Sequence, residues 1–118
     1  MYQENVVLCA SSAYDKKFWF NEDFSSLPEQ VRQELQIMCV LYTEDVGGIL
    51  SLEYDYDGNL LFKVDVRDND YYFDEIGSAL KIKEIRRTKK ELLEAIEMYY
   101  KVFFLEQDMN ELLDNQED

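Results

Sequence analysis

Acidic side chains in the middle of the chain are the first place where residue type and spacing could do chemistry. Asp55, Asp57 and Asn59 alternate along the sequence, and oxygen ligands at alternate positions begin the calcium loop of an EF-hand. The rest of that loop fails, because Leu60 stands where the sharp turn needs glycine and Val66 stands where the ion needs a bidentate glutamate. The pattern therefore predicts a plain hairpin turn and no calcium site.

A second acidic group follows between Asp65 and Glu75. Its carboxylates are the kind of ligand that Mg²⁺ or Ca²⁺ takes, with Asp68, Asp70 and Asp74 as the weak candidates. Turns and helix starts favour the same residues for structural reasons. We therefore expect no metal and no cofactor, and keep a carboxylate-metal-dependent enzyme using this cluster as the alternative function.

The chain contains no histidine, which excludes Ser-His-Asp and Cys-His nucleophile pairs and every histidine metal ligand. Its four glycines, at positions 47, 48, 58 and 77, form neither GxGxxG nor GxxxxGK. No phosphate-binding loop is indicated. We therefore expect no catalytic residues and no enzymatic activity.

Two cysteines, Cys9 and Cys39, lie far apart in sequence without a CxxC motif, which is too few for a disulfide framework. A free cysteine on an apolar stripe packs as a small hydrophobe, so we expect a packing role and a reducing, cytoplasmic location. The N-terminus lacks the positive start and long apolar core of a secretion signal.

Charge is strongly polarised along the chain. The formal net charge is −14, yet residues 81–90 carry six bases and one acid, so this segment is +5 and the other 108 residues sum to −19. The acidity argues against nucleic acid and anionic membranes as partners. The negative background favours an ordinary solvated face or an intramolecular pairing with the acids for this basic segment, and the alternative is a docking site for an acidic protein.

The end of the last predicted helix holds more aromatic surface than one helical stripe can bury. Tyr99 and Phe103 share one face, while Tyr100 and Phe104 point around the cylinder. Either the domain covers both sides, or the excess forms an interface with a second copy or another protein. As interface residues we predict two aromatic contacts with a basic rim: Tyr100, Phe104, Arg86, Arg87, Lys89 and Lys90.

Periodicity places these residues on a series of elements. Strands are predicted at 6–10 and 16–20, joined by a turn. A helix begins at the capping box formed by Ser26 and Glu29, with Pro28 in its first turn, and ends before Gly47-Gly48. Its apolar stripe recurs at spacings of three and four: Leu27, Val31, Leu35, Met38, Cys39 and Tyr42.

The second half begins with a meander. Residues 49–55 alternate with Leu50, Leu52 and Tyr54 on one face, and residues 60–66 repeat the pattern after a turn at Gly58. A short third strand is predicted at 71–73. Helical periodicity returns from Asp74, with an apolar side formed by Ile76, Leu80, Ile85, Leu92, Ile96, Tyr99 and Phe103.

A capping box at Thr88-Lys89-Lys90-Glu91 favours two helices, 74–86 and 88–105, over one rod. The fold class is therefore α+β, with one antiparallel sheet of about five strands in the order β-β-α-β-β-β-α-α and helices packed on it. We predict that residues 1–118 form a single domain, with an acidic C-terminal tail at 106–118 that is helical and then frayed. The predicted core includes Leu35, Leu52, Phe62, Val64, Ile96 and Phe103.

Three segments carry a resemblance: residues 1–9, 37–48 and 74–83. They resemble an uncharacterised family, a domain of unknown function, of short acidic cytosolic proteins from clostridia-type bacteria. The resemblance implies a bacterial cytosolic protein and supplies no functional residue. The element order also resembles profilin-like and longin-type domains, in which a five-stranded antiparallel sheet carries helices. Because fold alone does not give function, this analogy merely favours an adaptor over an enzyme.

Taken together, the residues predict a small acidic protein-protein interaction module of the cytoplasm, acting as an adaptor, inhibitor or chaperone. The partner is either a second copy, giving a homodimer, or another protein. Surface charge would speed and orient the encounter, and buried tyrosine and phenylalanine would supply affinity.

Overall fold

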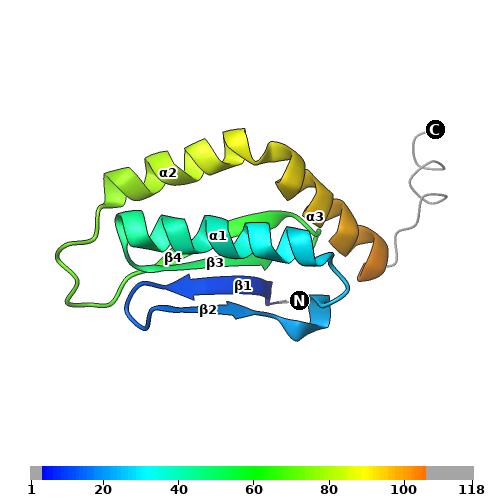
Figure 1. Cartoon of the computed structure of the whole chain (residues 1–118), viewed down its shortest axis with the longest axis horizontal. Coiled ribbons are helices and arrows are strands. Elements are labelled where there is room, and N and C mark those ends of the chain that lie inside the picture. The colour runs from blue at the N-terminus through cyan, green and yellow to red at the C-terminus, as the bar shows by residue number, and fades with distance from the viewer. Residues whose placement is uncertain (1–3, 106–118) are drawn as a thin grey trace.

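A computed structural model describes residues 4–105, which form a four-stranded antiparallel sheet with three helices on one of its faces (Figure 1). The sheet order is β2-β1-β3-β4, with β1 (Val6–Ser12), β2 (Lys17–Phe20), β3 (Ile49–Tyr54) and β4 (Leu60–Asp65). The helices are α1 (Glu29–Val46), α2 (Glu75–Thr88) and α3 (Lys90–Phe103), and a short 3-10 helix, η1 (Glu22–Phe24), follows β2. The α+β prediction is confirmed, with four strands instead of about five.

The buried face of the sheet is centred on β3. Its alternating side chains Leu50, Leu52 and Tyr54 are fully buried, as their spacing predicts. Antiparallel pairing sets Leu52 opposite Cys9 of β1 and opposite Phe62 of β4. The three strands therefore present one continuous apolar surface to the helices.

A bulge in β1 adds a further residue to this surface. The pairing with β3 shifts between Val7 and Cys9, which leaves Leu8 as the extra residue. Leu8 and Cys9 are consecutive, yet both are fully buried. A regular strand would turn one of them to solvent.

Glycines occupy the turns where the sequence predicts chain reversal. Gly58 has φ +87°, as a left-handed turn position requires, and Gly47 and Gly48 end α1 at φ +84° and +73°. Gly48 is also close to its neighbours, since an added Cβ would lie 3.1 Å from the carbonyl oxygen of Asp65. This turn therefore needs glycine for its conformation and for its space.

Two predicted capping boxes are wrong, although the helices begin near the predicted residues. The side chain of Ser26 contacts the hydroxyl of Tyr99 instead of capping α1, whose cap position is Pro28. Thr88 donates its hydroxyl to the carbonyl of Glu84, 2.9 Å away, and does not cap α3. In both places a tertiary or backbone partner replaces the local cap.

The predicted strand at 71–73 is wrong. Its residues lie in the irregular segment between β4 and α2, where the backbone N–H of Tyr72 donates to Asp70 Oδ1 at 3.0 Å. That side-chain bond closes a turn. The chain turns towards α2 before it can pair with β4.

The break between α2 and α3 at Lys89 confirms two helices, but the predicted continuous stripe across them is partly wrong. Ile85 and Ile96 are buried as expected. Ile76, Leu80 and Phe103 are instead 76%, 63% and 68% exposed. Ile85 lies five residues after Leu80, about 140° around the helix axis, so the stripe already fails within α2, whose buried side carries Ser78 and Ile85.

The predicted core is otherwise confirmed at its centre. Leu35, Leu52 and Ile96 are buried, while Phe62 and Val64 are half-buried at the β4 edge. The predicted acidic tail, 106–118, lies outside the described residues.

Replacement of Leu52 by alanine tests the buried face. We expect the free energy of unfolding to fall by about 2–5 kcal/mol, because a fully enclosed leucine leaves a cavity. Leu41→Ala is the matched control, since Leu41 is 50% exposed and its loss should stay within about 0.5 kcal/mol. Urea unfolding measures both, and equal losses would contradict the assignment of faces.

Alkaline pH should destabilise the fold. Burial raises the pKa of Tyr54 far above its ordinary value of 10.0. Stability is therefore complete below the pKa of the unfolded tyrosine and falls as pH rises above it, because only the unfolded chain ionises readily. Urea unfolding at increasing pH should show this decline, and Tyr54→Phe should make it shallower. An unchanged slope in that variant would contradict the burial effect.

Candidate interaction surface

The outer face of α2 carries a row of exposed side chains, two of them apolar and two basic. Ile76, Leu80, Lys83 and Arg87 follow at spacings of four, three and four, so they share one side of the helix. All four are exposed. We call this row the α2 seam.

The inner face of α2 fixes the direction of the seam. Tyr42 of α1 is fully buried, and its hydroxyl contacts the hydroxyl of Ser78. Nearby, Lys81 Nζ lies 3.0 Å from Asp45 Oδ2. Asp74 caps the helix by accepting from the N–H of Gly77 at 2.8 Å. With these contacts in place, the seam must face outward.

Two neighbouring tyrosines extend this exposed surface beyond the start of α2. Tyr71 and Tyr72 are 87% and 97% exposed. Exposed tyrosine beside aliphatic residues is typical of protein interfaces, because the ring offers large contact area at low conformational cost. The sequence pattern placed Tyr71 and Tyr72 in a strand and did not predict their exposure.

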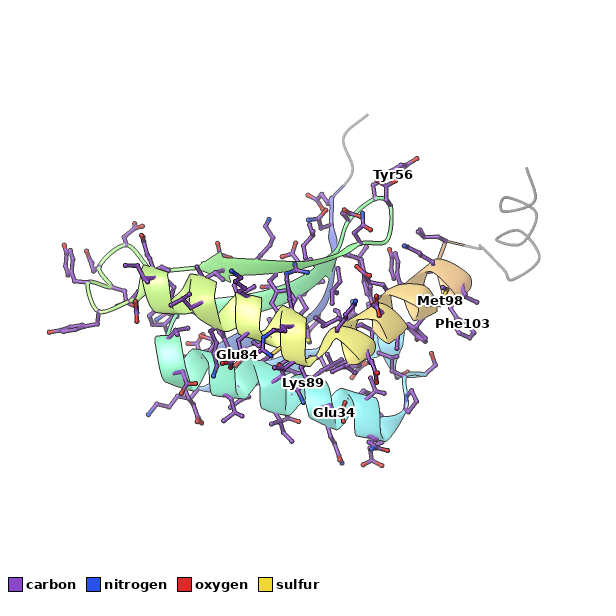
Figure 2. All side chains as sticks on the ribbon, turned by 90° about the horizontal axis from the view of Figure 1, so that it is seen from above. Glu34, Tyr56, Glu84, Lys89, Met98 and Phe103 are labelled. Atoms are coloured by element: carbon purple, nitrogen blue, oxygen red, sulfur yellow. The ribbon has the colours of Figure 1, made fainter. Side chains whose placement is uncertain are left out.

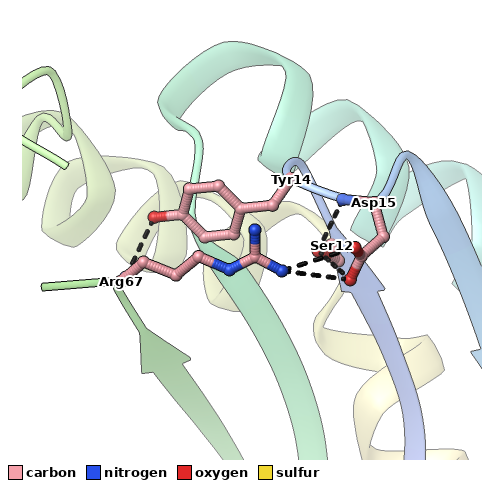
Figure 3. A network of polar contacts seen from close by, with 4 residues as sticks. All are labelled: Ser12, Tyr14, Asp15 and Arg67. Carbon is pink, nitrogen blue, oxygen red and sulfur yellow. Dashed lines mark hydrogen bonds and ion pairs between the residues drawn. The ribbon is translucent and has the colours of Figure 1, made fainter. Parts of the chain in front are cut away.

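A polar network holds the loop that bears these tyrosines (Figure 3). Tyr14, in the β1–β2 turn, donates its hydroxyl to Asp70 Oδ2 at 2.6 Å, and this bond raises the pKa of Tyr14. The guanidinium of Arg67 lies 4.4 Å from the centre of the Tyr14 ring and 3.3 Å from Asp15 Oδ1. Because Asp70 also accepts from Tyr72, the network orders the loop directly beside the exposed rings.

The predicted basic rim lies where α2 meets α3, with its four members exposed and gathered at one corner: Arg86, Arg87, Lys89 and Lys90. Figure 2 shows Lys89 at this corner near Glu34 of α1. The Arg86 guanidinium lies 4.7 Å from the centre of the Phe62 ring. None of the four forms an ion pair within residues 4–105. The rim residues are thus brought together, and Arg87 belongs to the α2 seam as well.

The predicted aromatic contacts have different positions. Tyr100 is only 7% exposed and stacks on Tyr54, with ring centres 4.0 Å apart. Phe104 is 40% exposed and its ring centre lies 4.7 Å from that of Phe24. The assignment of Tyr100 as a surface contact is therefore wrong, because η1 and β3 cover it within the domain. Phe103 is the exposed ring of this helix end (Figure 2).

Three of the acidic residues weighed for metal binding have structural partners. Asp70 accepts from Tyr14, and Asp74 caps α2. Asp55 is partly desolvated, but hydrogen bonds donated by Asn59 and Asp57 outweigh this and lower its pKa. Within residues 4–105, no group of three acidic or cysteine side chains is placed to hold a metal ion. The acids at Asp68, Asp70 and Asp74 therefore do not converge.

The two cysteines meet the packing expectation. Cys9 and Cys39 are free thiols, fully buried in the core between β1 and α1. A hydrogen bond with Cys39 and burial raise the pKa of the Cys9 thiol well above its ordinary value. A thiol kept protonated in this way is a weak nucleophile.

The fold defines this protein as a two-layer α+β domain with its helices on one face of an antiparallel sheet. The chain belongs to the DUF6145 family, a family of unknown function, whose model matches residues 5–108. This confirms the resemblance to an uncharacterised family. Comparison with curated proteins and with solved structures gave no match. The four-stranded sheet also departs from the five strands of the profilin-like and longin-type layout.

No helix within residues 4–105 is both long and apolar enough to cross a membrane.

Paired substitutions separate the buried ring from the exposed one. Tyr100→Ala should lower the free energy of unfolding by about 3–5 kcal/mol, as for other buried aromatics, because it removes the ring stacked on Tyr54. Phe103→Ala should cost less than about 1 kcal/mol, since Phe103 is 68% exposed. Urea unfolding of both variants is the measurement. The reverse order would show that the helix is rotated relative to this structure.

Proposed function

We propose that this chain is a protein-interaction module, not an enzyme, and that the α2 seam binds the α2 helix of a second copy in antiparallel orientation. The observation that carries the proposal is the exposure of Tyr72, Ile76 and Leu80, at 97%, 76% and 63%, on one ordered segment. Exposed apolar groups that gather on one face mark interaction sites more often than isolated ones do.

The charges of α2 favour a second copy as the partner. Acidic residues Asp74 and Glu75 begin the helix, and basic residues Lys83, Arg87 and Lys89 follow in its second half. A twofold axis relates identical surfaces, so it places the acidic start of one helix beside the basic end of the other. Antiparallel α2 helices are therefore complementary in charge, whereas parallel helices would oppose like charges.

The register follows from the length of the helix. If the twofold axis of the dimer crosses α2 at its midpoint, between Lys81 and Ile82, Leu80 of one copy lies opposite Lys83 of the other. Ile76 then lies opposite Arg87, which brings the guanidinium within one residue of Glu75. The alkyl stems of lysine and arginine can cover the apolar side chains while their charged ends reach the acids.

A cytoplasmic location belongs to the proposal and is supported by the two free thiols. A protein partner, without nucleic acid or membrane, is supported by the net charge of −14, which repels phosphate-rich surfaces.

Sedimentation velocity over a range of protein concentrations tests the docking surface. We expect the unmodified chain to dimerise reversibly, more weakly at high salt because exposed charges are screened. Leu80→Lys should weaken the dimer by at least about tenfold, since it sets a lysine opposite Lys83 of the other copy. Tyr72→Ser should weaken it too. Tyr56→Ser is the matched control, because Tyr56 is an exposed tyrosine in the distant β3–β4 turn (Figure 2).

A charge exchange tests the antiparallel orientation. Glu75→Arg and Arg87→Glu should each weaken the dimer, because each sets like charges opposite one another. The double variant should restore it. Each substitution also reverses a charge at one end of α2, and these two effects on helix stability add in the double variant. A restored dimer affinity therefore reports the contact between the two copies alone. A monomer at every concentration would overturn the proposal, as would a seam that captures only a different protein.

A further inference from the structure

A cavity of about 580 Å³ lies between the β1–β2 hairpin and the second half of α1. The hairpin side of the cavity carries Lys16, Lys17 and Phe18, and the helix side includes Val40 and Glu44. This volume is within the range of about 300–1,000 Å³ that small-molecule sites occupy. The cavity lies away from the α2 seam, and the proposed interaction does not use it.

Two buried hydroxyls line the cavity. Ser11 and Thr43 are nearly fully buried, and Ser11 Oγ lies 2.9 Å from Thr43 Oγ1. Thr43 can donate its single proton to the carbonyl of Val40 at 3.1 Å. In that arrangement Ser11 donates to Thr43, which leaves the Ser11 oxygen able to accept a hydrogen bond from a ligand.

The cavity also carries positive charge in an acidic protein. Lys16 and Lys17 are exposed, and neither forms an ion pair within the part of the chain that the structure describes. The adjacent carboxylate of Asp15 is already paired with Arg67. Lys17 is paired with Ser12 and therefore lies on the opposite face of the sheet from Ser11. The Lys16 ammonium group is thus the one offered to an anion at the edge of the cavity.

The backbone at Lys16 gives a separate indication that its side chain is used. Lys16 has φ +51°, and it is the one residue other than glycine with positive φ among residues 4–105. Glycine adopts this conformation without steric conflict, whereas lysine does not. Strain kept at one position of a turn is typical of sites where the side chain has a function.

We infer that this cavity binds a small organic anion that also carries a hydroxyl group, such as a phosphate monoester or a hydroxycarboxylate. Lys16 holds the anionic group, and Ser11 accepts the hydrogen bond of the hydroxyl. Phe18 and Val40 contact the carbon skeleton. The carboxylate of Glu44 disfavours ligands whose second group is also an anion.

Isothermal titration calorimetry of the full chain tests the ligand class with defined probes. Glycerol 3-phosphate represents the phosphate monoesters and 3-hydroxybutyrate the hydroxycarboxylates, so the two arms distinguish the source of the anion. Glycerol, which lacks the anion, and inorganic phosphate, which lacks the hydroxyl carbon skeleton, should bind at least about tenfold more weakly than the better probe. If neither organic anion binds, or if glycerol binds equally well, the inference is overturned.

Lys16→Gly separates binding from folding. The variant should unfold at a higher urea concentration than the unmodified chain, because glycine relieves the strained backbone. It should nevertheless bind the better probe at least about tenfold more weakly, because one ammonium group is lost. Equal or tighter binding by this more stable variant would overturn the inference.

Two further variants localise the effect. Lys17→Gln should leave binding unchanged, since Lys17 lies on the opposite face of the sheet from Ser11, and Lys63→Gln should also leave it unchanged, since Lys63 lies in β4 outside the cavity. Amide NMR shifts on titration should concentrate at residues 11–18 and 40–44. Lys16→Gly does not alter the α2 seam, so the oligomeric state of this variant should match that of the unmodified chain. The oligomeric state therefore reports on the proposed dimer, while the affinity for the probe reports on the cavity.

Discussion

The attachment of α3 to the sheet through Tyr54 is the constraint on which the helical layer depends. The Tyr54 hydroxyl donates to the carbonyl oxygen of Ile96 at 2.8 Å, and its ring stacks on Tyr100 at 4.0 Å. The side chain is fully buried, so an unpaired hydroxyl there would be costly. One tyrosine at the end of β3 thus sets the position and the rotation of α3.

This attachment determines how α2 can lie. α2 is attached separately to α1 through Tyr42 and Ser78 and through Asp45 and Lys81. Two helices attached to different elements at different angles cannot continue as one rod, and the chain breaks at Lys89. The contacts of α2 with α1 leave Ile76 and Leu80 facing away from the core, which creates the α2 seam.

The basic residues are grouped differently in the folded protein than along the chain. Two basic regions stand on a strongly acidic protein, one at the α2–α3 corner and one at Lys16 and Lys17. The first was visible in the sequence as a basic run. The second becomes visible only in the fold, where Lys16 of the β1–β2 turn lies near Ser11 of β1 and Thr43 of α1. An acidic surface limits unspecific contacts with anions and leaves these two regions as the places where anionic groups are attracted.

The sequence by itself determined the elements and much of the core. Alternation in β3, the stripe of α1 and the glycines at 47, 48 and 58 follow from local periodicity and backbone conformation, which act over a few residues. Only the tertiary structure decided the rotation of α2, the burial of Tyr100 and the loop at Tyr72. Each depends on a partner more than 25 residues away in sequence, such as Tyr42 for α2, Tyr54 for Tyr100 and Tyr14 for the loop. A periodic pattern shows that a helix has an apolar face, but the geometry of its partners decides which face is buried.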